Sequence, residues 1–451
     1  MKIKHKLSVA CGFSAVLMVS IILVASATRH ILIGGNRISG KTKAAIIAVA
    51  SLPGEVNGVY RLMSARVNGA DRVENIYRDY NSKSNSGKIA GYLIIPYLSS
   101  NNISQIAAIN LINYSNKIIF SNAEARRKAI YTDVLVGSES RRHSEISSFN
   151  GAFHPHLSSN GDLTYNVLWN DLVSIDLQTG REKWRVRGSF HHSIETDTHG
   201  NYWVCASIDP GATLNPERNT KHSNSQFEDQ AIVNVSQSGK IIDSISVANL
   251  LVENHLEHLL YGVSNPNLNP DPIHLNHVNP INNSTSYFTE GQLLVSLRNL
   301  STILLVEPRK RKVLWHKTGP WMNQHCVILN SDSKISIFDN HSFASGEFWL
   351  DAKWRSRVVS YDFSTGSSGE VVLNAQSPRD FKVPYSGRVI RISDGEWVLE
   401  DSVVGTVLVF KDQKLIYKWS NNYSSETVGV TSWSRFIPER DASETLKVIL
   451  N

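Results

Sequence analysis

Short apolar runs separated by polar turns recur along most of the chain. In the clearest copy, Gly161-Asp162-Leu163-Thr164-Tyr165 is followed by a second apolar run at 172–177, a polar turn at 178–180 and Trp184. The runs are rich in β-branched and aromatic residues and are bounded by Gly, Asn, Asp and Ser. This pattern predicts antiparallel strands rather than helices.

The same unit is found six times, and its size predicts the architecture. A unit of a few strands cannot bury both of its faces alone, so it must pack against its neighbours. Units of roughly 40–60 residues have the size of four-stranded propeller blades. We therefore expect an all-β, six-bladed β-propeller over residues 88–451. The copies begin at Gly91, Gly161, Gly200, Gly291, Lys334 and Gly395.

Two segments interrupt or complete the strand pattern. Residues 248–255 have the pattern of a helix and are expected to form a helical insertion before His274. The last segment, through Trp433 and Phe436, follows the sixth unit. We expect it to close the ring of blades against the first one.

The N-terminus predicts export. An apolar run without charge extends from Leu7 to Thr28 and is preceded by three lysines. Such a run can span a bilayer as a helix, and the basic flank keeps its start in the cytoplasm. Ala25-Ser26-Ala27 also fits a signal-peptidase site, so residues 1–29 are a transmembrane anchor or a signal segment. With residues 30–87 as a juxtamembrane linker, both alternatives place the propeller outside the cytoplasm, on the periplasmic side of the cell envelope.

One motif in the linker points to a different chemistry. The segment from Gly35 to Thr42 matches the phosphate-loop pattern G-x-x-x-x-G-K-[ST]. A working phosphate loop needs a strand before it and a helix after it, within a parallel sheet. The residues after Thr42 show no alternation of strands and helices, and the match lies just past the predicted membrane segment. We interpret it as part of the linker.

Composition refines this picture only slightly. The chain has 451 residues, of which 41% are hydrophobic and 19% charged, which excludes a disordered chain. The formal charge of +6 includes the basic N-terminus, so the propeller is nearly neutral and no nucleic-acid partner is expected. Cys11 lies in the apolar N-terminal segment. Cys205 and Cys326 are expected to be buried free thiols, although the number of cysteines also allows a disulfide between them.

Histidines gather at the ends of predicted strands, where side chains reach the central funnel of a propeller. The elements concerned are His191-His192, His274, His277-Val278-Asn279, Arg298 and Gln324-His325. The spacings His274-x-x-His277 and His255-x-x-His258 are also typical of metal ligands. A zinc or copper site would need further convergent ligands, and we predict no metal and no cofactor.

The order of these elements resembles the arylsulfate sulfotransferase family, which are six-bladed propellers of bacterial envelopes. That family has a histidine pair before a D-x-x-G strand, an H-x-N element, an S-x-R strand end, and a Q-H before a strand ending in D-N. The resemblance covers about residues 88–425, and Ser193 and Cys326 depart from the family's pattern. The matching residues are His191-His192 with Asp197 and Gly200, His277-Val278-Asn279, Ser296-Leu297-Arg298, and Gln324-His325 with Phe338-Asp339-Asn340.

The resemblance implies transfer of a sulfuryl group from a phenolic sulfate ester to a phenolic acceptor, without a nucleotide sulfate donor. It makes His325 the nucleophile, which forms a sulfohistidine. It makes Arg298 the cation that binds sulfate oxygens through its planar fork of donors.

The other family positions have supporting roles. The resemblance makes His192 and His277 hydrogen-bond donors to the remaining sulfuryl oxygens. It also implies that one of these two histidines protonates the departing phenoxide. It assigns His191 and Asn279 to substrate contact or to holding a tautomer.

One alternative stays open on the sequence alone. A non-catalytic envelope propeller could use the same loops to bind protein or carbohydrate. A scaffold has no need to direct three histidines and an arginine to one funnel, so their convergence would favour the enzyme. Membrane attachment through the N-terminal helix is expected in either case, and homo-oligomerisation is left open.

Overall fold

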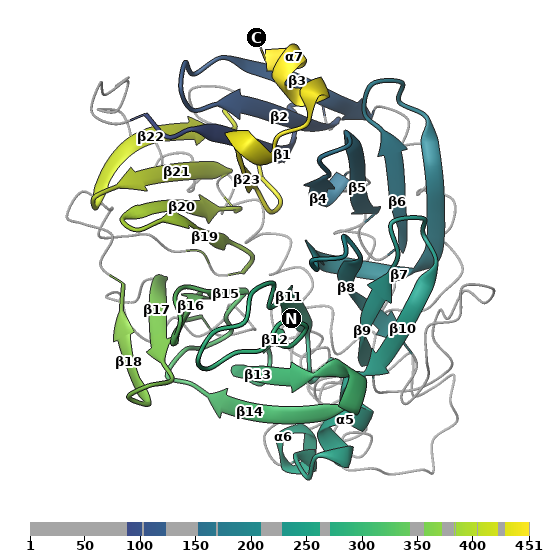
Figure 1. Ribbon diagram of the computed structural model, residues 1–451, viewed down its shortest axis with the longest axis vertical. Coiled ribbons are helices and arrows are strands. Elements are labelled where there is room, and N and C mark those ends of the chain that lie inside the picture. The colour runs from purple at the N-terminus through teal and green to yellow at the C-terminus, as the bar shows by residue number, and fades with distance from the viewer. Residues whose placement is uncertain are drawn as a thin grey trace, which may run out of the picture. The chain divides into compact units, whose positions relative to one another are not determined.

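A computed structural model describes residues 88–101, 103–122, 152–167, 170–208, 228–261, 271–342, 356–371, 383, 385–403, 405–422 and 429–450. The chain divides into two compact units, Met1–Asn68 and Gly69–Asn451, and every described residue belongs to the second. Most of the described residues lie in strands (Figure 1). The all-β prediction is therefore confirmed for this part of the chain.

Four of the sheets contain four antiparallel strands each. In three of them the strands follow chain order, as expected of units joined by short turns. The first sheet differs, because its edge strand β23 comes from the C-terminal end of the chain. The strands are β23 (Arg435–Pro438), β1 (Gly91–Leu98), β2 (Ser104–Asn110) and β3 (Asn116–Asn122); β11 (Leu275–Pro280), β12 (Leu293–Leu297), β13 (Thr302–Glu307) and β14 (Lys312–Thr318); β15 (Cys326–Leu329), β16 (Lys334–Asp339), β17 (Arg357–Asp362) and β18 (Ser367–Glu370); and β19 (Arg388–Ser393), β20 (Glu396–Asp401), β21 (Thr406–Lys411) and β22 (Lys414–Ser420).

The fifth sheet has seven strands, because the long strand β7 (Glu182–Thr196) belongs to two groups. Its first part pairs with β6 and its last part with β8, and the register with β8 shifts between His191 and Ile194. The structure thus shows a propeller-like arrangement with four separate four-stranded blades, and the predicted number of six is not confirmed. The other strands are β4 (Ala152–Leu157), β5 (Asp162–Val167), β6 (Asn170–Asp176), β8 (Tyr202–Ile208), β9 (Asp229–Val235) and β10 (Ile241–Ser246).

The sheets contact one another in a closed ring. β1 packs against β4, β7 and β8 against β11, β11 against β15, β15 against β19, and β19 against β23 (Figure 1). β23 then pairs with β1, from Gly91↔Pro438 to Ile94↔Arg435. The predicted closure of the ring by the segment through Phe436 is confirmed.

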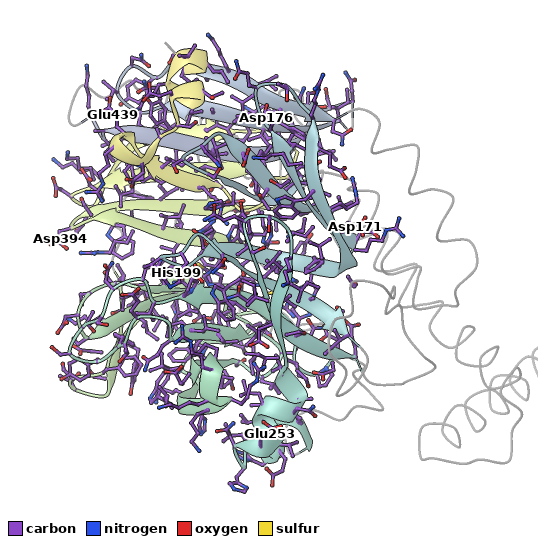
Figure 2. All side chains as sticks on the ribbon, turned by 45° about the vertical axis from the view of Figure 1, so that its right-hand side comes forward. Asp171, Asp176, His199, Glu253, Asp394 and Glu439 are labelled. Atoms are coloured by element: carbon purple, nitrogen blue, oxygen red, sulfur yellow. The ribbon has the colours of Figure 1, made fainter. Side chains whose placement is uncertain are left out.

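Apolar side chains fill the spaces between neighbouring sheets, while charged side chains such as Asp171, Asp394 and Glu253 point outward at the margin (Figure 2). Burying one large apolar side chain contributes about 1.5–3 kcal/mol. One close approach matters for the site: a Cβ on Gly387 would lie 2.4 Å from the Phe338 ring, and the φ of Gly387 is +92°. Only glycine fits there, and it fixes the backbone just before β19.

The predicted helical insertion is confirmed. Helices α5 (Val247–Glu253) and α6 (Glu257–Tyr261) follow β10, and the Ser246 hydroxyl caps α5 by accepting the Asn249 N–H at 3.0 Å. The other helical elements among the described residues are η2 (Pro308–Lys310), η3 (Glu439–Asp441) and α7 (Glu444–Leu450).

The described cysteines are not bridged. Cys205 and Cys326 are both free and buried, as expected. Burial raises the pKa of each thiol to about 12, so neither forms a thiolate at neutral pH.

The N-terminal predictions concern residues that the structure does not describe. Within the described ranges, no helix combines the length and the apolar character needed to cross a bilayer. The predicted anchor or signal at 1–29, the linker at 30–87 and the phosphate-loop match at 35–42 lie outside those ranges.

Candidate active site

Six residues with a left-handed backbone lie at equivalent places around the ring. Each is in, or just before, a strand through which one sheet contacts the next, and their φ angles range from 49° to 67°. Left-handed backbone is uncommon for residues other than glycine and is often found at functional sites. These residues are His154, His192, His274, Asn323, Ser386 and Trp433.

Three histidines from different sheets meet at this ring. His192, His274 and His325 each have a ring nitrogen, and these three nitrogen atoms lie within 4.8 Å of one another. The ring centroids are 5.1 Å apart for His192 and His274, and 6.2 Å apart for His192 and His325. The structure therefore brings two of the predicted site histidines together, with His274 as the third.

His325 is held in one tautomer by its neighbours. The Asn340 side chain donates to Val383 O at 2.7 Å and to Ser386 O at 2.8 Å, so its oxygen is the atom that faces His325 Nδ1 at 2.7 Å. His325 Nδ1 must then carry the proton. The lone pair on Nε2 accepts the Ser386 backbone N–H at 3.1 Å. Burial and the nearby charge of Arg298 hold the pKa of His325 well below 6.5, so the ring is neutral at neutral pH.

Arg298 follows β12 and is 8% exposed. Its backbone N–H donates to His274 O at 3.0 Å, and its Nη1 donates to Asn299 Oδ1 at 2.7 Å. Its Nε–H is buried without a hydrogen-bond partner among the described residues. Burial lowers the pKa of Arg298 to about 10 against the opposing effect of Asp271, so the guanidinium stays charged at neutral pH. A buried cation with an unused donor suits an anionic ligand.

His274 contacts the side chain of Asp271. Its Nδ1 contacts Asp271 Oδ2, and its backbone N–H donates to Asp271 Oδ1 at 2.9 Å. Burial acts to raise the pKa of Asp271, but the charge and hydrogen bonds of His274 outweigh it and lower that pKa. The carboxylate therefore orients the imidazole and leaves Nε2 of His274 for proton transfer.

His277 lies in a separate, buried network. Its Nδ1 accepts the Val327 N–H at 3.0 Å, and its Nε2 is 3.5 Å from Glu195 Oε1. Glu195 is in turn paired with Arg388 at 3.0 Å and with Arg435 at 2.7 Å. Burial acts to raise the pKa of Glu195, but the two guanidinium groups hold it well below its usual range. Both nitrogens of His277 thus face protein groups.

The two remaining predicted residues support their neighbours. His191 is fully buried, and its Nδ1 lies 2.7 Å from Nδ1 of His192, so one of the two donates to the other. The Asn279 amide donates to Val327 O at 3.2 Å and so joins β11 to β15. His191 therefore adjoins the histidine cluster, whereas the hydrogen bond from Asn279 links two sheets.

Sequence reasoning gave no catalytic role to His274, Asp271 or Ser386, and used Asn340 only as part of a motif. One signal was available for His274. The chain contains two successive His-x-Asn elements, His274-Leu275-Asn276 and His277-Val278-Asn279, and the first is preceded by Asp271. The choice between the two depends on the left-handed backbone at His274, which the sequence does not reveal.

Among the described residues, His192, His274 and His325 are also the group with metal-like geometry, rather than either spaced pair in the sequence. One feature of this group opposes a cation, because the positive charge of Arg298 acts on His325. A neutral imidazole, a buried cation and a histidine–aspartate pair instead suit transfer of an anionic group.

Comparison with known proteins agrees with this chemistry. Residues 155–420 match a family model described as Arylsulfotransferase (ASST). The matched range includes His192, His274, Arg298 and His325. No curated protein matches the chain.

Several solved structures are distantly similar. They include a streptogramin B lyase (10% identity, TM-score 0.38, covering 75% of this chain and 86% of that one). A nidogen/laminin complex has 8% identity and a TM-score of 0.43, covering 77% of this chain and 99% of that one. Sqt1 of Saccharomyces cerevisiae has 11% identity and a TM-score of 0.35, covering 74% and 69%. Likeness at this level carries no argument about activity.

Proposed function

Because the chain belongs to the arylsulfotransferase (ASST) family, we propose that it moves a sulfuryl group from a phenolic sulfate ester to a phenolic acceptor through a sulfohistidine at His325. The reaction needs no nucleotide sulfate donor. The observation that carries the proposal is the state of His325. Its Nδ1 proton is fixed toward Asn340, which leaves the lone pair on Nε2, and one nitrogen of its ring lies within 4.8 Å of ring nitrogens of His192 and His274.

In the first half-reaction, the His325 Nε2 lone pair attacks the sulfur of the donor. The N–S bond forms while the S–O bond to the aryl group breaks, and the bonding electron pair leaves on the phenoxide oxygen. His274, in its imidazolium form beside Asp271, gives its Nε2 proton to that oxygen. The Asn340 oxygen accepts from Nδ1–H of the sulfated ring and stabilises its positive charge.

The second half-reaction reverses these steps with the acceptor. The acceptor hydroxyl gives its proton to Nε2 of His274, and its oxygen attacks the sulfur. The S–N bond breaks, and its electron pair returns to His325 Nε2. The product is a new phenolic sulfate, and the free enzyme is restored.

The sulfuryl oxygens need donors throughout, because negative charge is spread over them in a loose transition state. In this proposal the Arg298 guanidinium supplies one through its Nε–H, which has no partner among the described residues. The Ser386 N–H, which bonds to His325 Nε2 in the free protein, releases that lone pair as sulfur approaches and then donates to a sulfuryl oxygen. His192 supplies a further ring nitrogen at the cluster.

Mass spectrometry of the full-length chain tests this proposal. After brief incubation with 4-nitrophenyl sulfate and no phenol, we expect a gain of about 80 Da on the peptide that carries His325, lost again when phenol is added. His325→Asn should abolish the gain. His199→Asn is the matched control, because His199 is exposed and outside the cluster (Figure 2). A catalytically inert scaffold would show neither adduct nor nitrophenol release.

Two further points belong to the same proposal. Strand β7 pairs with β6 along its first part and with β8 along its last part. This supports counting the seven-stranded sheet as two blades, which would make six blades in all.

The apolar run from Leu7 to Thr28 supports a location of the propeller outside the cytoplasmic membrane. A sulfate donor that is not a nucleotide suits a location outside the cytoplasm.

A further inference from the structure

A further histidine, His154, lies beside the cluster and has no part in the steps above. It belongs to β4, has a φ of 49° and is 7% exposed. Its ring stacks on Trp433, with centroids 4.5 Å apart and planes within 8° of parallel. The His192 ring meets it edge-on at 6.0 Å. His154 thus continues the row of rings that starts at His325.

One ring atom of His154 matters for ligand binding. Its Nδ1 is buried and has no hydrogen-bond partner among the described residues. A buried polar atom in a native structure is normally paired, because leaving it unpaired is costly. A ligand that supplies this hydrogen bond would therefore bind favourably at His154.

The ring is held in place rather than free to seek another partner. Trp433, on which it stacks, donates its indole N–H to Glu195 Oε1 at 3.2 Å and its backbone N–H to Glu400 Oε1 at 3.0 Å. The left-handed backbone of His154 further fixes the direction in which its side chain leaves the backbone.

The charge state of the ring limits what it can bind. Burial, with Arg388 and Arg435 nearby, holds the pKa of His154 well below 6.5. The imidazole is therefore neutral and offers one lone pair and one N–H. A sulfuryl group has acceptor oxygens only and is better matched by Arg298. A hydroxyl both donates and accepts, so it can pair with either nitrogen of a neutral imidazole.

We propose that His154 Nδ1 binds the hydroxyl of the phenolic acceptor and so defines the acceptor subsite. The inference rests on the proposed function, because the acceptor enters only in its second half-reaction. His154 acts here as a specificity-determining residue that holds the hydroxyl near His192 and the sulfated His325. The proton itself still passes to His274.

The two half-reactions separate this role from the rest of the chemistry. His154→Phe keeps a ring on Trp433 and removes both nitrogens. The leaving oxygen of the donor passes through the same place, but an ester oxygen is a poor hydrogen-bond acceptor and 4-nitrophenolate is a weak base. With the full-length variant, we therefore expect the burst of 4-nitrophenolate at saturating 4-nitrophenyl sulfate to stay within about twofold of the wild type. The KM for phenol should rise about tenfold, which is the loss of about one hydrogen bond. Should the variant fail to fold, His154→Leu is measured instead.

His156→Phe is the matched control. His156 lies in the same strand, but its ring packs against Tyr202 at 5.7 Å. We expect it to leave both half-reactions unchanged. An unchanged KM for phenol in His154→Phe would overturn the proposal and assign Nδ1 to a water molecule.

Failure of the proposed function gives a different result. In that case the wild type itself shows no burst and no adduct. Calorimetric titration with phenol then still tests the site without turnover. Binding to the wild type that is lost in His154→Phe supports the subsite, whereas no binding to the wild type, or equal binding to both, refutes it.

Discussion

Asn340 Oδ1 lies 2.7 Å from Nδ1 of His325, and the amide of the same Asn340 donates to the carbonyls of Val383 and Ser386. The two outward bonds prevent the amide from turning over, so the histidine tautomer is set by residues of the loop before β19. The same loop supplies the Ser386 N–H that bonds to His325 Nε2 at 3.1 Å. One buried asparagine therefore links His325 to the backbone that covers it.

Asn340→Ala should slow the sulfation of His325. Without the amide oxygen, Nδ1 loses its acceptor and the ring can take the wrong tautomer, and losing such an orienting partner typically costs about 10–100-fold. The rate of the nitrophenolate burst measures the effect.

Asn421→Ala controls for the loss of a buried bridging amide. The Asn421 side chain also donates to two carbonyls, Leu98 O at 2.8 Å and Val430 O at 3.1 Å, but does not contact His325. It should lower the melting temperature with little effect on the burst. An equal loss of rate in both variants would mean that Asn340 acts only through stability.

Asp271→Asn should make the rate depend more steeply on the leaving group. The change removes the charge that pairs with His274 while keeping the side chain's size. Phenyl sulfate releases a basic phenoxide that needs a proton, so its half-reaction should fall about 10²-fold. 4-Nitrophenyl sulfate releases a weak base and should be affected far less. Single-turnover rates with the two donors measure the difference.

Asp243→Asn is the control for removing a paired aspartate. Asp243 pairs with Arg311 at 2.6 Å, between β10 and the turn before β14, and takes no part in the histidine cluster. It should alter neither rate. Equal slowing of both donors in Asp271→Asn would argue against His274 as the proton donor.

Much of the fold follows from local pattern. Apolar runs bounded by turn residues predict the strands, and the closing role of the segment through Phe436 follows from its place after the last unit. The merging of two units through β7 does not follow from local pattern. It requires Glu182–Thr196 to continue as one strand across a bulge. That stretch contains Gly188-Ser189, two residues of the types that bound the other strands, so the local pattern would end a strand there.

The site was predictable where its residues sit next to a strand end, as Arg298 and His325 do. The site was harder to predict where one backbone angle decides which side chain reaches it. His274, rather than His277, joins the cluster. The network around Glu195 was hidden for another reason. Its partners Arg388 and Arg435 come from β19 and β23, far along the chain, and only closure of the ring brings them together.

Glu195→Gln should destabilise the propeller strongly. The substitution leaves two buried guanidinium groups, Arg388 and Arg435, without their shared counter-charge. Removing one partner of a buried ion pair costs about 3–5 kcal/mol. The free energy of unfolding from urea titration measures the loss.

Glu182→Gln gives the comparison with an exposed pair. Glu182 contacts Arg185 at 2.6 Å on the surface, and such pairs contribute at most about 1 kcal/mol. If the two variants lose the same small amount, the Glu195 network does not hold the sheets together.

The stability of the propeller should fall as the pH drops below about 6.5. Burial is the main cause that lowers the pKa of His154, His277 and His325 in the folded protein. The unfolded chain therefore binds more protons than the folded one below the ordinary pKa. Stability is then complete above that pH and is lost progressively as the pH falls, by up to about 1.4 kcal/mol per pH unit for each such ring. Urea titrations at pH 8, 7, 6 and 5 measure the slope, which His154→Phe should reduce and the exposed-site variant His199→Asn should leave unchanged. A free energy of unfolding that stays constant or rises on acidification would show that these imidazoles are protonated in the folded protein.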